Sequence, residues 1–74
     1  MTKVPDIKTF GEIIKKVRKS QNLTQEQLAA ACGVGRRFII ELENGKATTH
    51  LGKALQVLFT LGISLNAVDR KGDL

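Results

Sequence analysis

The sequence predicts an all-α domain of four helices, and three observations lead to this prediction. Apolar residues recur at three- and four-residue spacing along most of the chain. Short stretches containing Gly, Ser, Thr and Asn interrupt this pattern and are typical of helix ends. The 74 residues are 42% hydrophobic, with three Phe and no Trp or Tyr, so they can fill one small and mainly aliphatic core.

We assign residues 1–8 to an N-terminal arm that runs into the first helix of a domain spanning residues 9–62. The apolar positions of this helix lie on one face, and its other face is basic. The pattern stops at the polar stretch 20–22, where we expect the helix to end. The apolar positions are Ile7, Phe10, Ile13, Ile14 and Val17.

A second helix is expected directly after this polar stretch. Thr24, followed three residues later by Gln27, forms a capping-box pattern that marks a helix start. The Ala-rich stretch then continues to Cys32, and Gly33 stops the helix. A short glycine turn therefore separates it from the helix that follows.

The third helix is expected over residues 36–44 and the fourth after it. Gly45 closes the third helix, because a residue without a side chain adopts the left-handed conformation readily. Thr48 or Thr49 then caps the fourth helix, which ends at Gly62. One face of the fourth helix is predicted to carry Leu51, Ala54, Leu55, Leu58 and Leu61.

The C-terminal segment, residues 63–74, is predicted to form a short β-strand and a charged tail. Ile63, Leu65 and Ala67 alternate with polar residues, which is the period of a half-buried strand. A lone strand leaves its backbone groups unpaired, so we expect it to pair with the same strand of a second copy in a homodimer. The alternative is a coil that packs on the fourth helix.

Charge favours a polyanionic partner. Twelve Lys and Arg against seven Asp and Glu give a formal charge of +5 and a sequence pI near 9.8. Nucleic acid fits better than a membrane surface, because the basic helices need their apolar faces for the core. No apolar run approaches the roughly 20 residues of a membrane span, and no signal-peptide core is present, which predicts a cytoplasmic protein.

The third helix places three charged residues and one isoleucine on one side. At about 100° per residue, Arg36, Arg37, Ile40 and Glu41 share a face. Arginine forks suit guanine O6 and N7, and an exposed isoleucine suits a thymine methyl group in the major groove. This face therefore predicts base reading in double-stranded DNA. Alternatively, the arginines are solvated or contact only phosphates.

The motifs of the second and third helices resemble those of the Cro/C1-type (Xre) helix-turn-helix family. The resemblance covers roughly residues 9–62 and implies a lambda-repressor-like helical bundle with a helix-turn-helix. It also implies that the third helix reads bases from its N-terminal end, which agrees with the face just described. The resembling residues are Leu23-Thr24-Gln25-Glu26-Gln27-Leu28-Ala29, Gly33-Val34 and Ile39 with Glu41-Leu42-Glu43-Asn44-Gly45-Lys46.

The family resemblance also implies phosphate contacts on either side of the groove. Such contacts map to the start of the second helix and to the end of the third. Gly35, in place of the usual Ser or Thr cap, lets the backbone approach a phosphate closely. Arg18 matches a family position that pairs with Glu43 and faces a phosphate; an ordinary exposed ion pair is the alternative. The expected phosphate-binding residues are Arg18, Thr24, Gln25, Gly35, Asn44, Gly45 and Lys46.

The C-terminal part consists of the fourth helix, Gly62-Ile63-Ser64-Leu65 and a short charged tail, and it resembles the HipB-like antitoxins in particular. This resemblance implies a repressor of its own operon, an operator DNA site and a partner toxin of the HipA-like kinase class. A stand-alone Xre-type regulator is the alternative. A protein-interaction module without specific DNA binding is a further alternative from a different functional class.

Catalysis, cofactors and metal binding are not expected. His50 and Cys32 are the only imidazole and thiol, and they lie far apart in the helical pattern. We interpret His50 as a surface residue rather than a ligand or pH switch. Cys32, which has no second cysteine to bond, is expected to be a buried thiol rather than a redox sensor. Phe38 is expected to fill core between the second and third helices rather than reach DNA.

Overall fold

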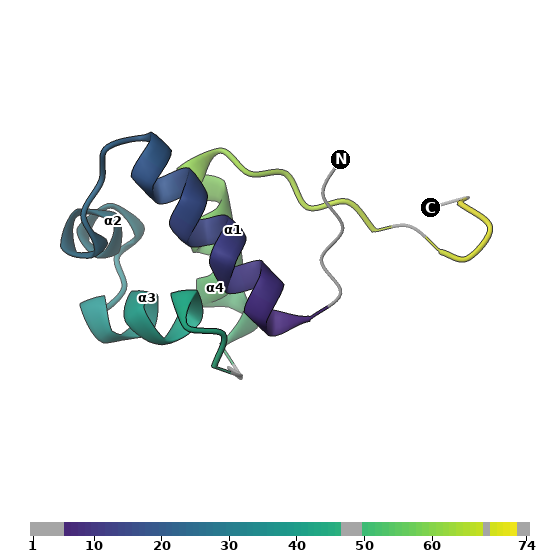
Figure 1. Ribbon diagram of the computed structural model, residues 1–74, viewed down its shortest axis with the longest axis horizontal. Coiled ribbons are helices and arrows are strands. Elements are labelled where there is room, and N and C mark those ends of the chain that lie inside the picture. The colour runs from purple at the N-terminus through teal and green to yellow at the C-terminus, as the bar shows by residue number, and fades with distance from the viewer. Residues whose placement is uncertain (1–5, 47–49, 68, 73–74) are drawn as a thin grey trace.

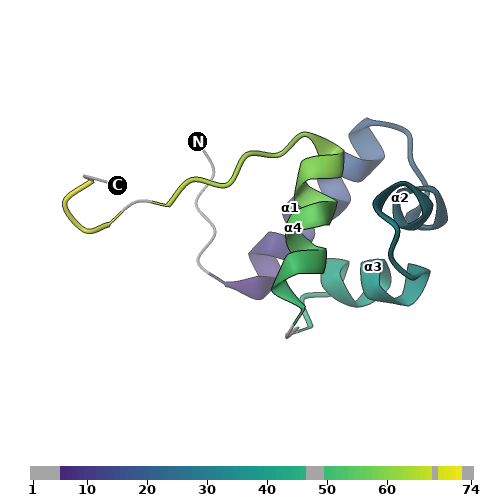
Figure 2. The same ribbon diagram turned by 180° about the vertical axis from the view of Figure 1, so that it is seen from behind.

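The computed structural model describes residues 6–46, 50–67 and 69–72, and it is built from helices. In chain order these are α1 (Ile7–Ser20), α2 (Gln25–Cys32), α3 (Arg36–Glu43) and α4 (Leu51–Leu61). In Figures 1 and 2, α1 and α4 lie side by side, and α2 and α3 pack at one side of this pair. The all-α prediction is confirmed for the described residues, and the first three helices match their expected ranges closely.

One aliphatic core lies between the helices, and each helix contributes to it. Burial of one such side chain stabilises the fold by about 1.5–3 kcal/mol. Phe10 and Phe38 are half-buried against this core, which confirms that Phe38 packs inward. Cys32 is 6% exposed, so the expectation of a buried thiol is also confirmed. The side chains that are almost completely buried are Ile14, Leu28, Ile39, Leu42, Val57 and Leu58.

Side chains from just before α1 and α2 cap their first turns. The Asp6 carboxylate accepts a hydrogen bond from the Thr9 backbone N–H at 2.8 Å. At α2 the capping box is complete: the Gln27 N–H donates to Thr24 Oγ1 at 3.0 Å, and the Thr24 N–H donates to Gln27 Oε1 at 2.9 Å. The predicted start of α2 is therefore confirmed with its mechanism.

All of the described helices end in the same way. A left-handed residue follows the helix, and the N–H of the next residue donates to a carbonyl five residues back in the chain, a Schellman motif. Glycine provides the left-handed residue except after α1, where Asn22 adopts a φ of 59°. The bonds run from Leu23 N to Arg18 O at 3.2 Å, Val34 N to Ala29 O at 3.0 Å, Lys46 N to Glu41 O at 3.0 Å and Ile63 N to Leu58 O at 2.9 Å.

The start of α4 and its buried face differ from the prediction. Thr48 and Thr49 lie outside the described residues, and the helix begins at Leu51, with His50 in the N-cap position. Leu51 is 67% exposed, although we predicted it to face the core. The buried face is centred about 70° away from Leu51 around the helix. The buried residues of α4 are Ala54, Val57, Leu58 and Leu61.

The segment after α4 forms no strand within residues 63–67. It leaves the helical body as an extended stretch in both views (Figures 1 and 2). Ile63 packs against the edge of the core, whereas Leu65 is 59% exposed. The predicted strand is thus not seen, and no second strand within residues 6–46, 50–67 and 69–72 offers it a hydrogen-bonding partner. Its pairing with a second copy stays a prediction.

Candidate nucleic-acid interface

The predicted base-reading residues lie together on the outer face of α3. Arg36 and Arg37 are exposed in its first turn, and Ile40 and Glu41 are half-buried one turn later. The opposite side of the helix is buried and consists of Ile39, Leu42 and Glu43. The structure thus brings the four predicted residues to one face, which we call the reading face.

The charges of α3 run against its own macrodipole. Arg36 and Arg37 lie in the first turn, where the helix dipole favours anions, and Glu41 and Glu43 lie near the end, where it favours cations. Each charge placed in this way costs about 0.3–1 kcal/mol at an exposed helix end. The helix dipole therefore does not explain the two exposed arginines.

Glu41 is paired with two cations on the same side of the molecule. Its Oε1 atom lies 3.3 Å from Arg37 Nε and 3.9 Å from Lys46 Nζ. The Schellman motif fixes the backbone of Lys46 onto α3, because the Lys46 N–H donates to the Glu41 carbonyl. All three side chains are at least 41% exposed, so each ion pair contributes at most about 1 kcal/mol to stability.

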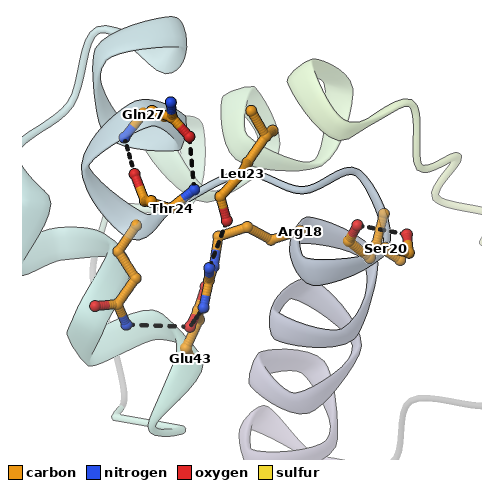
Figure 3. A network of polar contacts seen from close by, with 8 residues as sticks. Arg18, Ser20, Leu23, Thr24, Gln27 and Glu43 are labelled. Atoms are coloured by element: carbon orange, nitrogen blue, oxygen red, sulfur yellow. Dashed lines mark hydrogen bonds and ion pairs between the residues drawn. The ribbon is translucent and has the colours of Figure 1, made fainter.

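A buried polar network connects α1, α2 and α3 (Figure 3). Arg18 Nε donates to Glu43 Oε2 at 2.6 Å, and Arg18 Nη2 donates to Glu43 Oε1 at 3.1 Å. Arg18 Nη1 donates to the Leu23 carbonyl at 2.7 Å, and Gln25 Nε2 donates to Glu43 Oε1 at 3.2 Å. Arg18 and Glu43 are 7% and 5% exposed. The alternative considered from the sequence was an exposed ion pair between these two residues, whereas the structure shows a buried one.

The network affects what Arg18 and Gln25 can offer to a phosphate. Each of the three guanidinium nitrogens of Arg18 already donates within the protein, and the Gln25 amide points at Glu43. The phosphate contacts expected of these two residues stay predictions. What the structure shows is that they hold α3 against α1 and α2.

The remaining predicted phosphate contacts lie at helix ends. The Thr24 hydroxyl accepts the capping bond, which leaves its own proton available to another acceptor. Gly35 precedes α3 with a φ of −74°, and an added Cβ would meet nothing within 4 Å, so neither backbone strain nor packing requires glycine there. Asn44, Gly45 and Lys46 form the exposed or half-buried corner after α3.

Sequence reasoning missed Gly11, which sets the distance between α1 and α3. A Cβ at Gly11 would lie 2.3 Å from the Leu42 carbonyl oxygen and 2.8 Å from that of Glu43. At Gly45 a Cβ would lie 2.8 Å from Lys8 Cα, so α1 closely approaches the corner after α3 as well. The sequence did offer a signal for this close packing. A glycine within a helix is unfavourable by about 1 kcal/mol relative to alanine, so its presence in an amphipathic helix suggests that a neighbouring element packs closely there.

Other chemistry finds little support in the part of the chain that the structure covers. No three His, Cys, Asp or Glu side chains gather there in a way that could hold a metal ion. His50 is exposed, as predicted for a surface residue. Lys53 Nζ of α4 lies 5.9 Å from the centre of the Phe38 ring, a cation–π contact that covers Phe38 from outside. None of the described helices is both long and apolar enough to cross a membrane.

Comparison with known proteins agrees with this geometry. A helix-turn-helix family model matches residues 14–68. An uncharacterized HTH-type transcriptional regulator of Sinorhizobium fredii, y4mF, is 55% identical over 57 residues, which cover 77% of this chain and 75% of that protein. The immunity repressor protein of Bacillus phage phi105 is 33% identical over 60 residues, which cover 81% of this chain and 42% of the repressor.

Two solved structures are similar along most of the chain. HipB in the HipA-HipB-O2-O3 complex matches with a TM-score of 0.84 and 26% identity, over 95% of this chain and 99% of that chain. The restriction-modification controller protein C.AhdI from Aeromonas hydrophila matches with a TM-score of 0.71 and 29% identity, over 80% of this chain and 86% of that chain.

Proposed function

We propose that this chain, which belongs to the Cro/C1-type (Xre) helix-turn-helix family of DNA-binding transcription regulators, represses transcription by reading an operator sequence with α3. The observation that carries this proposal is the reading face. It presents two exposed arginines at the start of α3, where the helix dipole disfavours positive charge.

Arg36, Arg37 and Ile40 are proposed to read bases. Each arginine can donate two parallel hydrogen bonds to guanine, and Ile40 can contact a thymine methyl group. Glu41, which was predicted to read bases with them, belongs to the same face and either reads a base or positions a residue that does. The proposed phosphate contacts place α3 in the groove from both sides and are sequence-independent. These contacts come from Arg18, Thr24, Gln25, Gly35, Asn44, Gly45 and Lys46.

A homodimer is proposed as the DNA-binding form. The large hydrophobic side chains that are exposed in the described residues are Leu51, Phe59 and Leu65. Leu51 and Phe59 lie two turns apart on α4, with half-buried Leu55 between them, and Leu65 follows in the extended segment. A stripe of this kind marks an interface more often than a solvated surface. A second copy would cover it, with Ile63, Leu65 and Ala67 pairing across a two-fold axis.

In vitro selection from a random duplex library tests the proposed function. We expect enrichment of a near-palindromic sequence with half-sites about 34 Å, or one helical turn, apart, because a two-fold dimer presents two copies of α3. A library that shows no enriched sequence after repeated rounds contradicts operator reading. It would favour the protein-interaction module instead.

A role as an antitoxin is a second candidate. It is supported by the similarity to HipB, which extends over 95% of this chain and thus includes the segment after α4. Under this proposal the chain represses its own operon and binds a toxin of the HipA-like kinase class; without a toxin it is a stand-alone regulator. Co-purification with the product of the neighbouring reading frame tests it. Absence of a kinase-like neighbour, or of a complex with it, leaves the stand-alone regulator.

A further inference from the structure

The reading face contains one carboxylate, and that carboxylate faces the side proposed for DNA. Glu41 is 41% exposed, and it lies one turn after Arg37 on α3. An unpaired carboxylate close to a phosphate backbone is repelled by it. Glu41 is not unpaired, however, since Oε1 contacts both Arg37 and Lys46. Any role of Glu41 at this position therefore involves its ion pairs with Arg37 and Lys46.

The contact between Glu41 and Arg37 leaves one edge of the Arg37 guanidinium free of this ion pair. Glu41 Oε1 pairs with Nε of Arg37 at 3.3 Å. The two terminal nitrogens of the guanidinium do not take part in this pair, and they are the nitrogens that can form a parallel fork to guanine O6 and N7. The carboxylate thus holds the inner edge of the guanidinium while its outer edge points away from Glu41.

Lys46 approaches the same oxygen of Glu41. Its backbone is fixed by the bond from its N–H to the Glu41 carbonyl at 3.0 Å, and Gly45 provides the left-handed turn with a φ of 77°. Lys46 Nζ lies 3.9 Å from Oε1. The Glu41 carboxylate therefore pairs with one proposed base-reading residue, Arg37, and with one proposed phosphate-binding residue, Lys46.

We propose that Glu41 is a positioning residue that sets DNA specificity through Arg37, an inference that rests on the proposed reading of DNA by α3. Glu41 holds Arg37 in the orientation that suits a base, which reduces the side-chain freedom lost on binding. Its charge also weakens the attraction of Arg37 to phosphates, which dominates binding to random sequence. Its pairing with Lys46 affects binding to all sequences alike and leaves discrimination unchanged. Discrimination increases because binding to non-specific DNA decreases.

Five variants and the wild type test this role. They are compared by fluorescence anisotropy on the selected duplex and on a random duplex, over a range of salt concentrations. Glu41→Gln removes the charge, Glu41→Asp keeps the charge but shortens the side chain, and Arg37→Ala removes the partner. Glu12→Gln removes the charge of an exposed carboxylate on α1 and is the matched control. The double variant of Arg37→Ala and Glu41→Gln completes the cycle.

We expect Glu41→Gln to bind random DNA more tightly, with a salt slope steeper by about one, since freed cations reach phosphates. The ratio of specific to random affinity should fall roughly fivefold or more, as for the loss of a good base contact. Glu41→Asp should lower this ratio without the steeper slope. In the Arg37→Ala background, Glu41→Gln should leave the ratio unchanged, and Glu12→Gln should leave it at the wild-type value.

Two results would overturn the inference while the proposed function stands. In the first, the wild type discriminates but Glu41→Gln keeps the wild-type ratio. In the second, selection with Glu41→Gln loses preference at a base pair different from the one that Arg37→Ala affects, which means that Glu41 reads a base directly, as a carboxylate can at cytosine N4. A wild type that does not discriminate overturns the proposed function, and this inference with it.

Discussion

Arg36 and Lys46 both bring positive charge to the proposed DNA side, but they do so from different positions. Arg36 is exposed at the first residue of α3, and Lys46 follows the left-handed Gly45 at the other end. The first position suits the floor of the major groove, and the second suits its edge. The two residues are therefore expected to affect binding in different ways.

Arg36→Ala should weaken binding to the selected duplex by about 1–3 kcal/mol and relax preference at one base pair. Lys46→Ala should weaken binding to all sequences alike and reduce the salt slope by about one. Anisotropy titrations on matched and single-substituted duplexes measure both effects. If the two variants lose affinity equally on every sequence, the assignment of Arg36 to base reading is wrong.

Glu43→Ala is predicted to be strongly destabilising, because it leaves the buried guanidinium of Arg18 without its carboxylate partner. The expected loss is about 3–5 kcal/mol in the free energy of unfolding. Urea unfolding followed by circular dichroism measures it, with Glu12→Ala as an exposed control. The double variant Arg18→Met, Glu43→Leu should recover much of the loss, since it removes both buried charges. A loss below about 1 kcal/mol for Glu43→Ala contradicts the buried network.

Residue spacing predicted some of these contacts and missed others. The capping box of Thr24 and Gln27 could be predicted because both partners lie within one helical turn. The pairing of Arg18 with Glu43 followed only from the family resemblance, and its burial did not follow at all. These residues lie 25 positions apart in the sequence, and local residue spacing does not predict whether such a distant pair is buried.

At the level of elements, the close approach of α1 to α3 sets the orientation of the reading face. Gly11→Ala should force the two helices apart, because the new Cβ would lie 2.3 Å from a backbone oxygen that cannot rotate away. The expected loss is about 1–3 kcal/mol. Gly52→Ala in α4 is the matched control, because nothing lies within 4 Å of its added Cβ. It should gain about 0.5–1 kcal/mol from helix propensity. Equal effects in thermal unfolding would contradict the close approach.

The N-cap of α1 predicts a pH dependence. The hydrogen bond from the Thr9 N–H lowers the pKa of Asp6 below 3.8. Because the pKa is lower in the folded state, the stabilisation is present above pH 3.8 and is lost as the pH falls through the folded value. Asp6→Asn keeps a capping oxygen without a charge. Between about pH 5 and about pH 2, the wild type should lose more stability than Asp6→Asn in urea unfolding. Parallel losses would exclude this role for the carboxylate.

Helix ends were more predictable than helix faces. A glycine, a capping residue or a polar stretch marked most ends, because each satisfies backbone groups locally. The face of α4 was assigned wrongly at Leu51, since leucine continues an apolar pattern whether the core or another surface covers it. The spacing of apolar residues alone therefore did not show which side of α4 faces the core.

At the level of the whole molecule, sequence patterning and resemblance led to the right fold class and family. The family comprises transcription regulators rather than enzymes, which confirms that the chain is not an enzyme. The strand predicted after α4 is not seen among residues 63–67, and the described part of the chain contains no second strand to pair with it. Pairing of this segment with a second copy depends on contacts between two chains, and the sequence pattern of one chain does not determine them.

Phe59→Glu tests the proposed dimer. Phe59 is 66% exposed in the single chain, so the fold should tolerate the change, while a charge in a covered apolar stripe should prevent association. Light scattering at micromolar concentration should show a dimer for the wild type and a monomer for Phe59→Glu. Gln56→Glu, an exposed position elsewhere on α4, is the control and should stay dimeric. A monomeric wild type contradicts the dimer.

The most direct test of operator reading by α3 is the ratio of affinities for the selected duplex and for random DNA, measured at one salt concentration. For the wild type we expect a ratio of about 10³ or more, which is typical of specific DNA-binding proteins. Arg36→Ala and Arg37→Ala should each lower it while the fold is retained. A wild-type ratio near one, or a high ratio that neither substitution changes, would contradict sequence reading by this face of α3.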